Sequence, residues 1–349
     1  MLHQLGSSFL VLPSVLAAAA KQDAWLAVPA ALAFQLPLIP VYLAIARRIG
    51  GRSFGEYLDS LWGQTAGRIV VGLFSLLFPF LIMAMTLRNL GDFISTSLMP
   101  ETPVEMPYFL MMSAVVYMIR AGVAVCGRTV EILSPIALSL LLIVFVSLIP
   151  SLDGDHLLPV FEYGWKPIVR GSFPLLAFPY LESVLFLFFL PHIRYAPWRK
   201  AVYASHAISG GIFVLLTLFT VATLSDGIVA NVSFPSYFVV RTISIGDFYE
   251  RFEVLITILW FIAIFIRLSL LMHVSSVGLA HACRLNSPQA LLIPLSLLAL
   301  IVANLVWPNM SALLELFNIW PFYALLFGAA FPLVVWLSGR LFRNTGGAS

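Results

Sequence analysis

Apolar segments of about 20 residues recur along almost the whole chain, and they constrain the fold more than any other feature. Inside a bilayer only helices and closed barrels satisfy every backbone polar group, and a helix needs roughly 20 apolar residues to cross. The composition agrees, because 61% of the 349 residues are hydrophobic and 10% are charged. The sequence therefore predicts an all-α polytopic membrane protein.

Ten apolar segments can be marked, and we expect each to be a transmembrane helix. Between the second and third segments, apolar residues recur at helical spacing within 51–67, which predicts a short helix in the membrane interface. The ten segments cover residues 6–20, 24–46, 68–97, 107–126, 129–150, 168–190, 201–224, 252–282, 288–307 and 311–341.

The charges of the connecting loops predict the orientation of the chain. With a cytoplasmic N-terminus, the inner side carries twelve of the 19 Lys and Arg residues and the outer side six. Acidic residues sort the other way, with eleven outside and three inside. The positive-inside rule therefore predicts that both termini are cytoplasmic, with a short cytoplasmic tail at residues 342–349.

Small residues and prolines interrupt the first and the sixth segments at matching places. The first reads Gly6-Ser7-Ser8-Phe9-Leu10-Val11-Leu12-Pro13, and the sixth carries two prolines between Gly171 and Glu182. Proline removes an amide donor and glycine loosens the backbone, so such a break leaves polar groups for a cavity or a ligand. Paired discontinuous helices predict a five-plus-five inverted repeat with a midplane binding site, here about 6–150 and 168–341 within one membrane domain, 1–349.

Three ionisable residues lie within apolar segments. Arg267 is near the middle of the eighth segment and should face the bundle interior. It could be a fixed cation that replaces a coupling ion beside the first helix, a clamp for a ligand carboxylate, or a structural arginine that binds backbone carbonyls. Glu182 follows the sixth-segment break, and we expect it to meet Arg267, a ligand ammonium group or exposed amides, as a proton relay or as a structural carboxylate. We expect Glu315 to be structural.

Other kinds of chemistry have no motif in this sequence. It shows no Gly-rich phosphate loop, no zinc motif and no Ser, His and acid set, so we expect neither an enzyme nor a bound metal or cofactor. His206 and His273 are expected to be buried hydrogen-bonding groups. Cys126 and Cys283 lack partners at metal spacing and are expected to be reduced. The scattered basic residues give no reason to expect a nucleic acid.

Several motifs resemble the B subunit of spore germinant receptors (the GerAB type), from about Gly6 to Cys283. Glu182 and Gly164 also fit that pattern. The motifs, in chain order, are Lys21-Gln22-Asp23-Ala24-Trp25, Met99-Pro100-Glu101-Thr102-Pro103, Gly127-Arg128-Thr129-Val130-Glu131-Ile132-Leu133-Ser134-Pro135, Leu158-Pro159-Val160 and Asp247-Phe248-Tyr249-Glu250-Arg251-Phe252-Glu253.

That resemblance implies a ten-helix protein with a LeuT/APC-like fold, related to the amino acid/polyamine/organocation transporters, in the inner membrane of endospores. It also implies a subunit that binds a nutrient germinant, often an amino acid, and works with A-type and C-type subunits in the lipid bilayer. One departure is the short start: Gly6 to Ala20 spans only about 22 Å of a roughly 30 Å core. We expect either that the true start lies further upstream or that this copy is incomplete on the inner side of the first helix.

These observations give two hypotheses for the same candidate site. In the first, the chain senses a small molecule whose carboxylate meets amides near Gly6, Ser7 and Ser8, and whose ammonium group meets carbonyls near Phe178 and Tyr180. In the second, it is a proton-coupled secondary transporter of amino acids, with Glu182 or Arg267 coupling the protons. Both hypotheses need the same cavity between the first and sixth segments.

Overall fold

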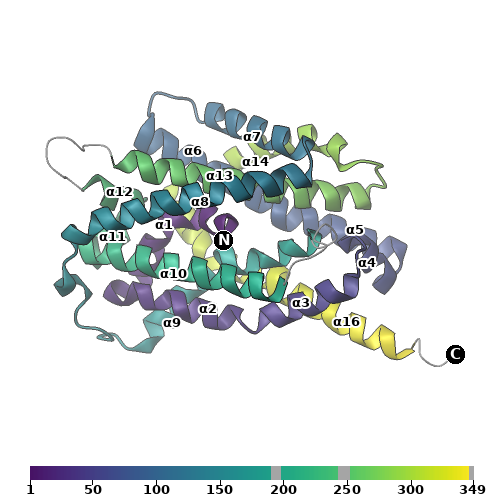
Figure 1. Ribbon diagram of the computed structural model, residues 1–349, viewed down its shortest axis with the longest axis horizontal. Helices are drawn as coiled ribbons and strands as arrows, with labels where there is room; N and C mark the ends of the chain where they lie inside the picture. The colour runs from purple at the N-terminus through teal and green to yellow at the C-terminus, as the bar shows by residue number, and fades with distance from the viewer. Residues whose placement is uncertain (190–197, 243–251, 346–349) are drawn as a thin grey trace.

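The computed structural model describes residues 1–189, 198–242 and 252–345, which form a bundle of helices (Figure 1). Within these ranges there is no β-strand, and eight helices are long and apolar enough to cross a membrane. The prediction of an all-α integral membrane protein with several spans is confirmed. The α-helices are α1 Leu2–Ala20, α2 Ala27–Gln35, α3 Leu38–Ile49, α4 Phe54–Trp62, α5 Gln64–Ser75, α6 Leu81–Phe93, α7 Glu105–Arg120, α8 Val123–Leu148, α9 Trp165–Leu175, α10 Trp198–Leu224, α11 Asp226–Asn231, α12 Pro235–Arg241, α13 Glu253–Ala282, α14 Leu292–Leu305, α15 Met310–Leu325 and α16 Phe331–Thr345.

Short 3₁₀ and π-helical turns join or interrupt these helices. The 3₁₀ turns are η1 Lys21–Leu26, η4 Ile149–Ser151, η5 Gly154–Leu157, η7 Leu181–Phe188 and η10 Pro288–Leu291. The π-helical turns are η2 Leu76–Phe80, η3 Ile94–Leu98, η6 Leu176–Tyr180 and η11 Leu326–Ala330. Single π turns are rare and are frequent at functional sites, so η6 within the sixth segment directs attention to that helix.

The helix count differs from the predicted ten in two places. The first and second segments follow each other so closely that they count as one long apolar helical stretch, Phe9–Ile49, among the eight. The fourth segment, predicted at 107–126, is α7, which has 16 residues and ends at Arg120. Gly122, with φ +100°, makes the turn into α8, so Cys126 belongs to the fifth segment rather than the fourth. The number of crossings therefore stays a prediction.

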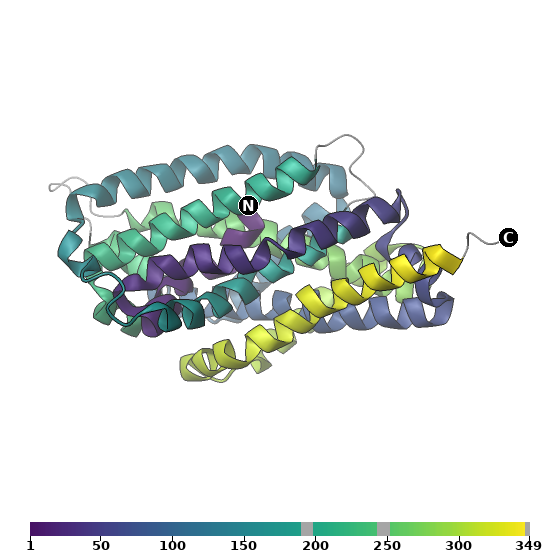
Figure 2. The same cartoon turned by 90° about the horizontal axis from the view of Figure 1, so that it is seen from below.

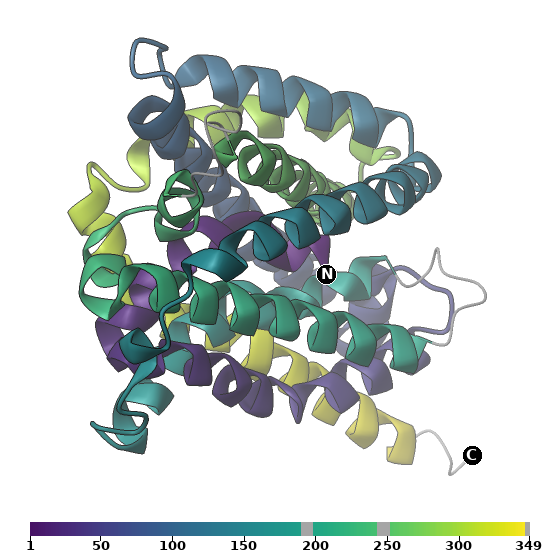
Figure 3. The same ribbon diagram turned by 60° about the vertical axis from the view of Figure 1, so that its left-hand side comes forward.

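Helix α1 lies at the centre of the bundle and is continuous, so the predicted break in the first segment is wrong. The N-terminus lies near the middle of the molecule (Figure 3), and α1 packs against α13, α9 and α11. Pro13 leaves the carbonyl of Phe9 without its helical amide, and the Ser236 hydroxyl donates to that carbonyl at 2.8 Å. A side chain from α12 thus replaces the lost hydrogen bond, and the helix needs no unwinding.

The short helix predicted within 51–67 is present as α4. Ser53 caps it, because the Ser53 hydroxyl accepts from the Glu56 amide while the Glu56 carboxylate accepts from the Ser53 amide. Phe54 packs on Phe188 and Phe331 with ring centroids 5.0 and 6.3 Å apart. One face of α4 is therefore anchored in the core.

The connection between α8 and α9 is fastened to the corner between α1 and α2. Both carboxylate oxygens of Asp23 accept from the Phe161 amide, at 3.1 and 2.9 Å. The Gln22 amide donates to the Pro159 carbonyl and to the Glu162 carboxylate, each at 2.9 Å. These contacts explain why Gln22 and Asp23 of the first motif are buried.

The C-terminal helices α15 and α16 lie along one edge of the bundle (Figure 2). Helix α16 continues to Thr345, so part of the predicted tail at 342–349 is helical, and residues 346–349 lie outside the described residues. The motif stretch Asp247–Arg251 also lies outside them. Tyr42 of α3 donates to the Gly328 carbonyl at 2.5 Å, which ties η11 to the second segment.

Candidate functional site

The break predicted in the sixth segment is present at Phe178. Its backbone angles, φ −122° and ψ 115°, are extended, and they separate α9 from the 3₁₀ turn η7. Pro179 follows directly and has no amide to continue a helix. The Phe178 ring stacks on Trp320 of α15 with centroids 4.9 Å apart and also contacts Phe317, so α15 supports the break from one side.

A buried ion pair lies one turn beyond this break. Arg267 Nη2 of α13 donates to Glu182 Oε1 of η7 at 2.6 Å, and both side chains have no solvent exposure. The second carboxylate oxygen, Oε2, lies 3.1 Å from His3 Nε2 of α1. Two charges removed from solvent are stable only when they are paired and hydrogen-bonded, and here both conditions hold for the pair.

The other guanidinium donors of Arg267 reach two further helices. Its Nη1 donates to the His3 carbonyl and its Nε to the Thr86 hydroxyl, both at 3.2 Å. Arg267 therefore connects α13 with α1, α6 and η7 at one point. Each of its three guanidinium nitrogens makes one hydrogen bond within the protein, and one N–H on each of Nη1 and Nη2 has no bond among these three. This geometry is compatible with a fixed cation, with a structural arginine and with a clamp for a ligand carboxylate, so its role stays a prediction.

Gly6 is required by close packing rather than by a break. A Cβ atom at this position would lie 2.8 Å from the Ala263 carbonyl oxygen and 2.8 Å from Arg267 Cβ. Glycine thus lets α1 approach α13 closely enough for the His3 contacts described above. The expectation of free amides at Gly6, Ser7 and Ser8 is wrong, because in a helix that begins at Leu2 the amides after the first turn bond within the helix. The side chains of Ser7 and Ser8 lie outside the described part of the chain.

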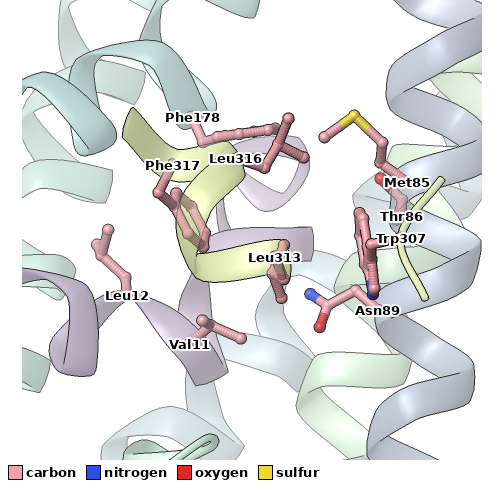
Figure 4. A pocket seen from close by; sticks show the side chains of 10 residues that line it. All are labelled: Val11, Leu12, Met85, Thr86, Asn89, Phe178, Trp307, Leu313, Leu316 and Phe317. Atoms are coloured by element: carbon pink, nitrogen blue, oxygen red, sulfur yellow. The ribbon is translucent and has the colours of Figure 1, made fainter. Parts of the chain in front are cut away.

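A small cavity of about 40 Å³ lies between the break, α1, α6 and α15 (Figure 4). Its walls are mostly aromatic and aliphatic, and the Thr86 and Asn89 side chains of α6 bring polar atoms to one wall. Thr86 also accepts a hydrogen bond from Arg267, so a residue of the cavity wall contacts the ion pair. The lining residues are Val11, Leu12, Met85, Thr86, Asn89, Phe178, Trp307, Leu313, Leu316 and Phe317.

Trp307 is held in the cavity wall by an ion pair of α6. The indole Nε1 donates to Asp92 Oδ2 at 2.8 Å, and Asp92 Oδ1 accepts from Arg88 Nε at 2.9 Å. Arg88 and Asp92 lie one turn apart on α6, so the pair that holds Trp307 is formed within a single helix.

The structure thus brings together part of the predicted set. Gly6, Glu182 and Arg267 meet at the ion pair, and Phe178 lines the cavity. Tyr180 lies elsewhere: it is buried and stacks on His206, with ring centroids 5.8 Å apart. His206 bonds the Ser183 hydroxyl and the Val202 carbonyl at 3.0 and 2.8 Å, in agreement with a structural role.

Sequence reading missed four residues of this region, namely His3, Thr86, Asn89 and Trp307. Thr86 and Asn89 lie one turn apart within an apolar segment, and that spacing on one helix face was an available signal. His3 precedes the first marked segment, and nothing in its neighbours indicates a buried carboxylate partner. Among the described residues, no group of His, Cys, Asp and Glu side chains is arranged to hold a metal ion.

Comparison with known proteins identifies the family. The family model Spore_permease, described as "Spore germination protein", matches residues 1–310. Spore germination protein KB of Bacillus subtilis (strain 168) is 28% identical over 99% of this chain and 95% of its own length. Spore germination protein XB of Bacillus anthracis is 29% identical over 62% of this chain and 61% of its own, and spore germination protein B2 of B. subtilis is 22% identical over 73% and 70%. The chain therefore belongs to the spore germination protein family.

Proposed function

We propose that this protein is the membrane subunit of a germinant receptor that binds a small nutrient molecule, such as an amino acid, in the cavity beside Phe178. The observation that carries the proposal is the juxtaposition of a backbone break, a cavity with aromatic and polar walls, and a buried ion pair, within a member of the spore germination protein family. Ligand sites of this kind are mostly apolar, with a few placed polar groups that fix the orientation of the ligand.

Binding at this cavity requires a change of conformation. A volume of about 40 Å³ has room for about one water molecule, whereas small-molecule sites are typically on the order of 300 Å³ or more. The aromatic side chains of Phe178, Trp307 and Phe317 must therefore move apart to admit an amino acid. A ligand that binds only the expanded state shifts the population toward it, and this shift is what partner subunits can detect.

A larger groove next to the cavity offers a route of entry. It has a volume of about 550 Å³ and lies between α1, α9, α11 and α15. Ser14, Arg170 and Asn318 bring polar groups to its lining, which suits water and a polar solute rather than lipid tails. Phe317 borders both the groove and the cavity, so we propose that its ring separates the two spaces in the closed state.

The Arg267 and Glu182 pair has a positioning role in this proposal. It joins α1, α6, η7 and α13 directly behind the cavity, so movement of Thr86 on ligand binding would be passed to all four elements. The competing function, a proton-coupled amino-acid transporter, would use the same carboxylate with His3 as its proton partner. The contacts of Glu182 are compatible with both functions, whereas membership of the spore germination protein family favours the sensor.

The remaining parts of the proposal rest on the resemblance and on the charge distribution. We propose five-plus-five inverted repeats at about 6–150 and 168–341, both termini on the cytoplasmic side, and residence in the inner membrane of the endospore. We also propose A-type and C-type subunits as partners. Co-purification of those subunits with a tagged copy of this chain tests the last point.

Direct binding tests the proposed function. The purified protein, in nanodiscs together with its partner subunits, is titrated with a panel of amino acids, sugars and nucleosides. A ligand found in this way should bind at least tenfold more weakly to Phe178→Ala and Asn89→Ala, and normally to Ile132→Ala, a control at an exposed position of α8. Normal binding by both cavity variants would contradict the assignment of the site. Uptake of the ligand into proteoliposomes, driven by a proton gradient, would favour the transporter.

A further inference from the structure

A groove runs along the outside of the bundle between α7 and α14 and shares no lining residue with the cavity described above. The two helices lie side by side in Figure 1. The groove has a volume of about 300 Å³. Two small residues, Ser113 of α7 and Ser296 of α14, line it beside larger side chains such as Phe109, Tyr117 and Leu300.

The length of the groove matches one leaflet of a bilayer. Its lining residues on α7 run from Phe109 to Arg120, and the eleven helical steps between them rise about 16 Å. Half of the roughly 30 Å hydrocarbon core is about 15 Å. The groove therefore extends from the end of α7 to about the depth at which a lipid tail ends.

The width of the groove selects among occupants. Counting all the space that no atom fills, about 720 Å³, and spreading it over about 16 Å gives a mean cross-section of at most about 45 Å². An α-helix with its side chains is about 10–12 Å across, or at least about 80 Å² in section. A helix from another subunit could only lie over the groove, whereas an extended hydrocarbon chain, one methylene wide, can lie inside it.

One end of the groove carries a positive charge. Arg120 is the last residue of α7 and is exposed. Among the described residues, no carboxylate forms an ion pair with it. Tyr117, 80% exposed, stands one turn before it on the same face. An arginine at the end of a transmembrane segment lies at headgroup depth, where it attracts anionic lipids.

We propose that this groove is a binding site for one anionic phospholipid, with an acyl chain between α7 and α14 and the headgroup phosphate on Arg120. The charge supplies the preference for an anionic headgroup, and the small serine side chains leave room for a tail. The site is separate from the ligand cavity and does not depend on the proposed function.

Native mass spectrometry of the purified protein, titrated with phosphatidylglycerol or with phosphatidylcholine of the same chain length, tests the proposal. Wild type should retain one phosphatidylglycerol in preference to phosphatidylcholine. Arg120→Gln should weaken that binding roughly fivefold, the effect of about one interfacial cation. Arg47→Gln, at an exposed position of α3, should leave it unchanged.

A second variant separates the role of the tail from that of the headgroup. Ser113→Leu fills the groove and should weaken both lipids, and Arg120→Gln keeps the test decisive if that variant does not fold. Equal retention of the two lipids by wild type would overturn the proposal, as would unchanged lipid binding in Arg120→Gln. Loss of a partner subunit from either variant, with lipid binding intact, would assign the groove to a protein contact instead and would equally overturn it.

Discussion

Replacing Glu182 with glutamine keeps the shape of the side chain and removes one of the two buried charges. Arg267 then keeps a full positive charge with no solvent exposure and only neutral acceptors, the His3 carbonyl and the Thr86 hydroxyl. Two unit charges about 4 Å apart attract by roughly 4 kcal/mol at an effective dielectric constant of 20. Removing one partner of a buried pair costs about 3–5 kcal/mol. The two figures agree, so we expect Glu182→Gln to destabilise the fold by about that amount.

The double variant Glu182→Gln with Arg267→Met makes this prediction specific to the pair. Arg267→Met alone should cost a similar amount, because it leaves the Glu182 carboxylate unpaired. The double variant leaves no buried charge unpaired, so its loss should be well below the sum of the two single losses. We expect a coupling free energy of at least about 2 kcal/mol between the two positions.

Thermal unfolding of the purified protein in detergent gives the measurement. At roughly 2 °C per kcal/mol for a chain of this size, each single variant should melt about 6–10 °C below wild type. Arg47→Met, at an exposed position, is the control and should change the free energy of unfolding by no more than about 0.5 kcal/mol. The reasoning is refuted if Glu182→Gln melts at the same temperature as that control. It is also refuted if the stability lost in the double variant equals the sum of the two single losses.

Two further predictions concern single contacts. Gly6→Ala should destabilise the fold by about 1–3 kcal/mol, because its Cβ would lie 2.8 Å from a backbone oxygen of α13. Gly211→Ala, where a Cβ meets nothing within 4 Å, is the matched control, and equal melting temperatures for the two variants would contradict the packing assigned to Gly6. Asp23→Ala removes both acceptors of the Phe161 amide and should make the connection between α8 and α9 cleavable by protease at least several-fold faster than in wild type, measured by limited proteolysis. Unchanged cleavage would show that the other contacts of this connection suffice to hold it.

The helical framework could be predicted from the sequence because the bilayer imposes a length and a hydropathy on each span. The break at Phe178 could also be predicted, since two prolines lie five positions apart within the sixth apolar segment. The same signals misled in the first segment. Gly6 and Pro13 have the composition of a break, yet one allows close packing on Arg267 and the other is compensated by the hydroxyl of Ser236.

The candidate site could be predicted only where burial forces a pairing. Arg267 and Glu182 lie deep in apolar segments, so a contact between them was one of a few available solutions. Trp307 shows the opposite case. It is the last residue of the ninth apolar segment, and its place in the cavity wall depends on Asp92, which is distant in sequence. Contacts between remote segments leave no local pattern, so local reasoning could not find them.

The fastened connection between α8 and α9 has a mechanical consequence. It is held at one end by Gln22 and Asp23 and at the other by the Ala222 carbonyl of α10, which accepts from the Asp153 amide and contacts His156. Because hydrogen bonds hold this connection at both ends, it should move little. The expansion that admits a ligand must therefore take place elsewhere in the bundle. Spin labels that report the separation of α15 from α9 should therefore move apart when ligand is added, while labels placed across the corner keep a constant distance.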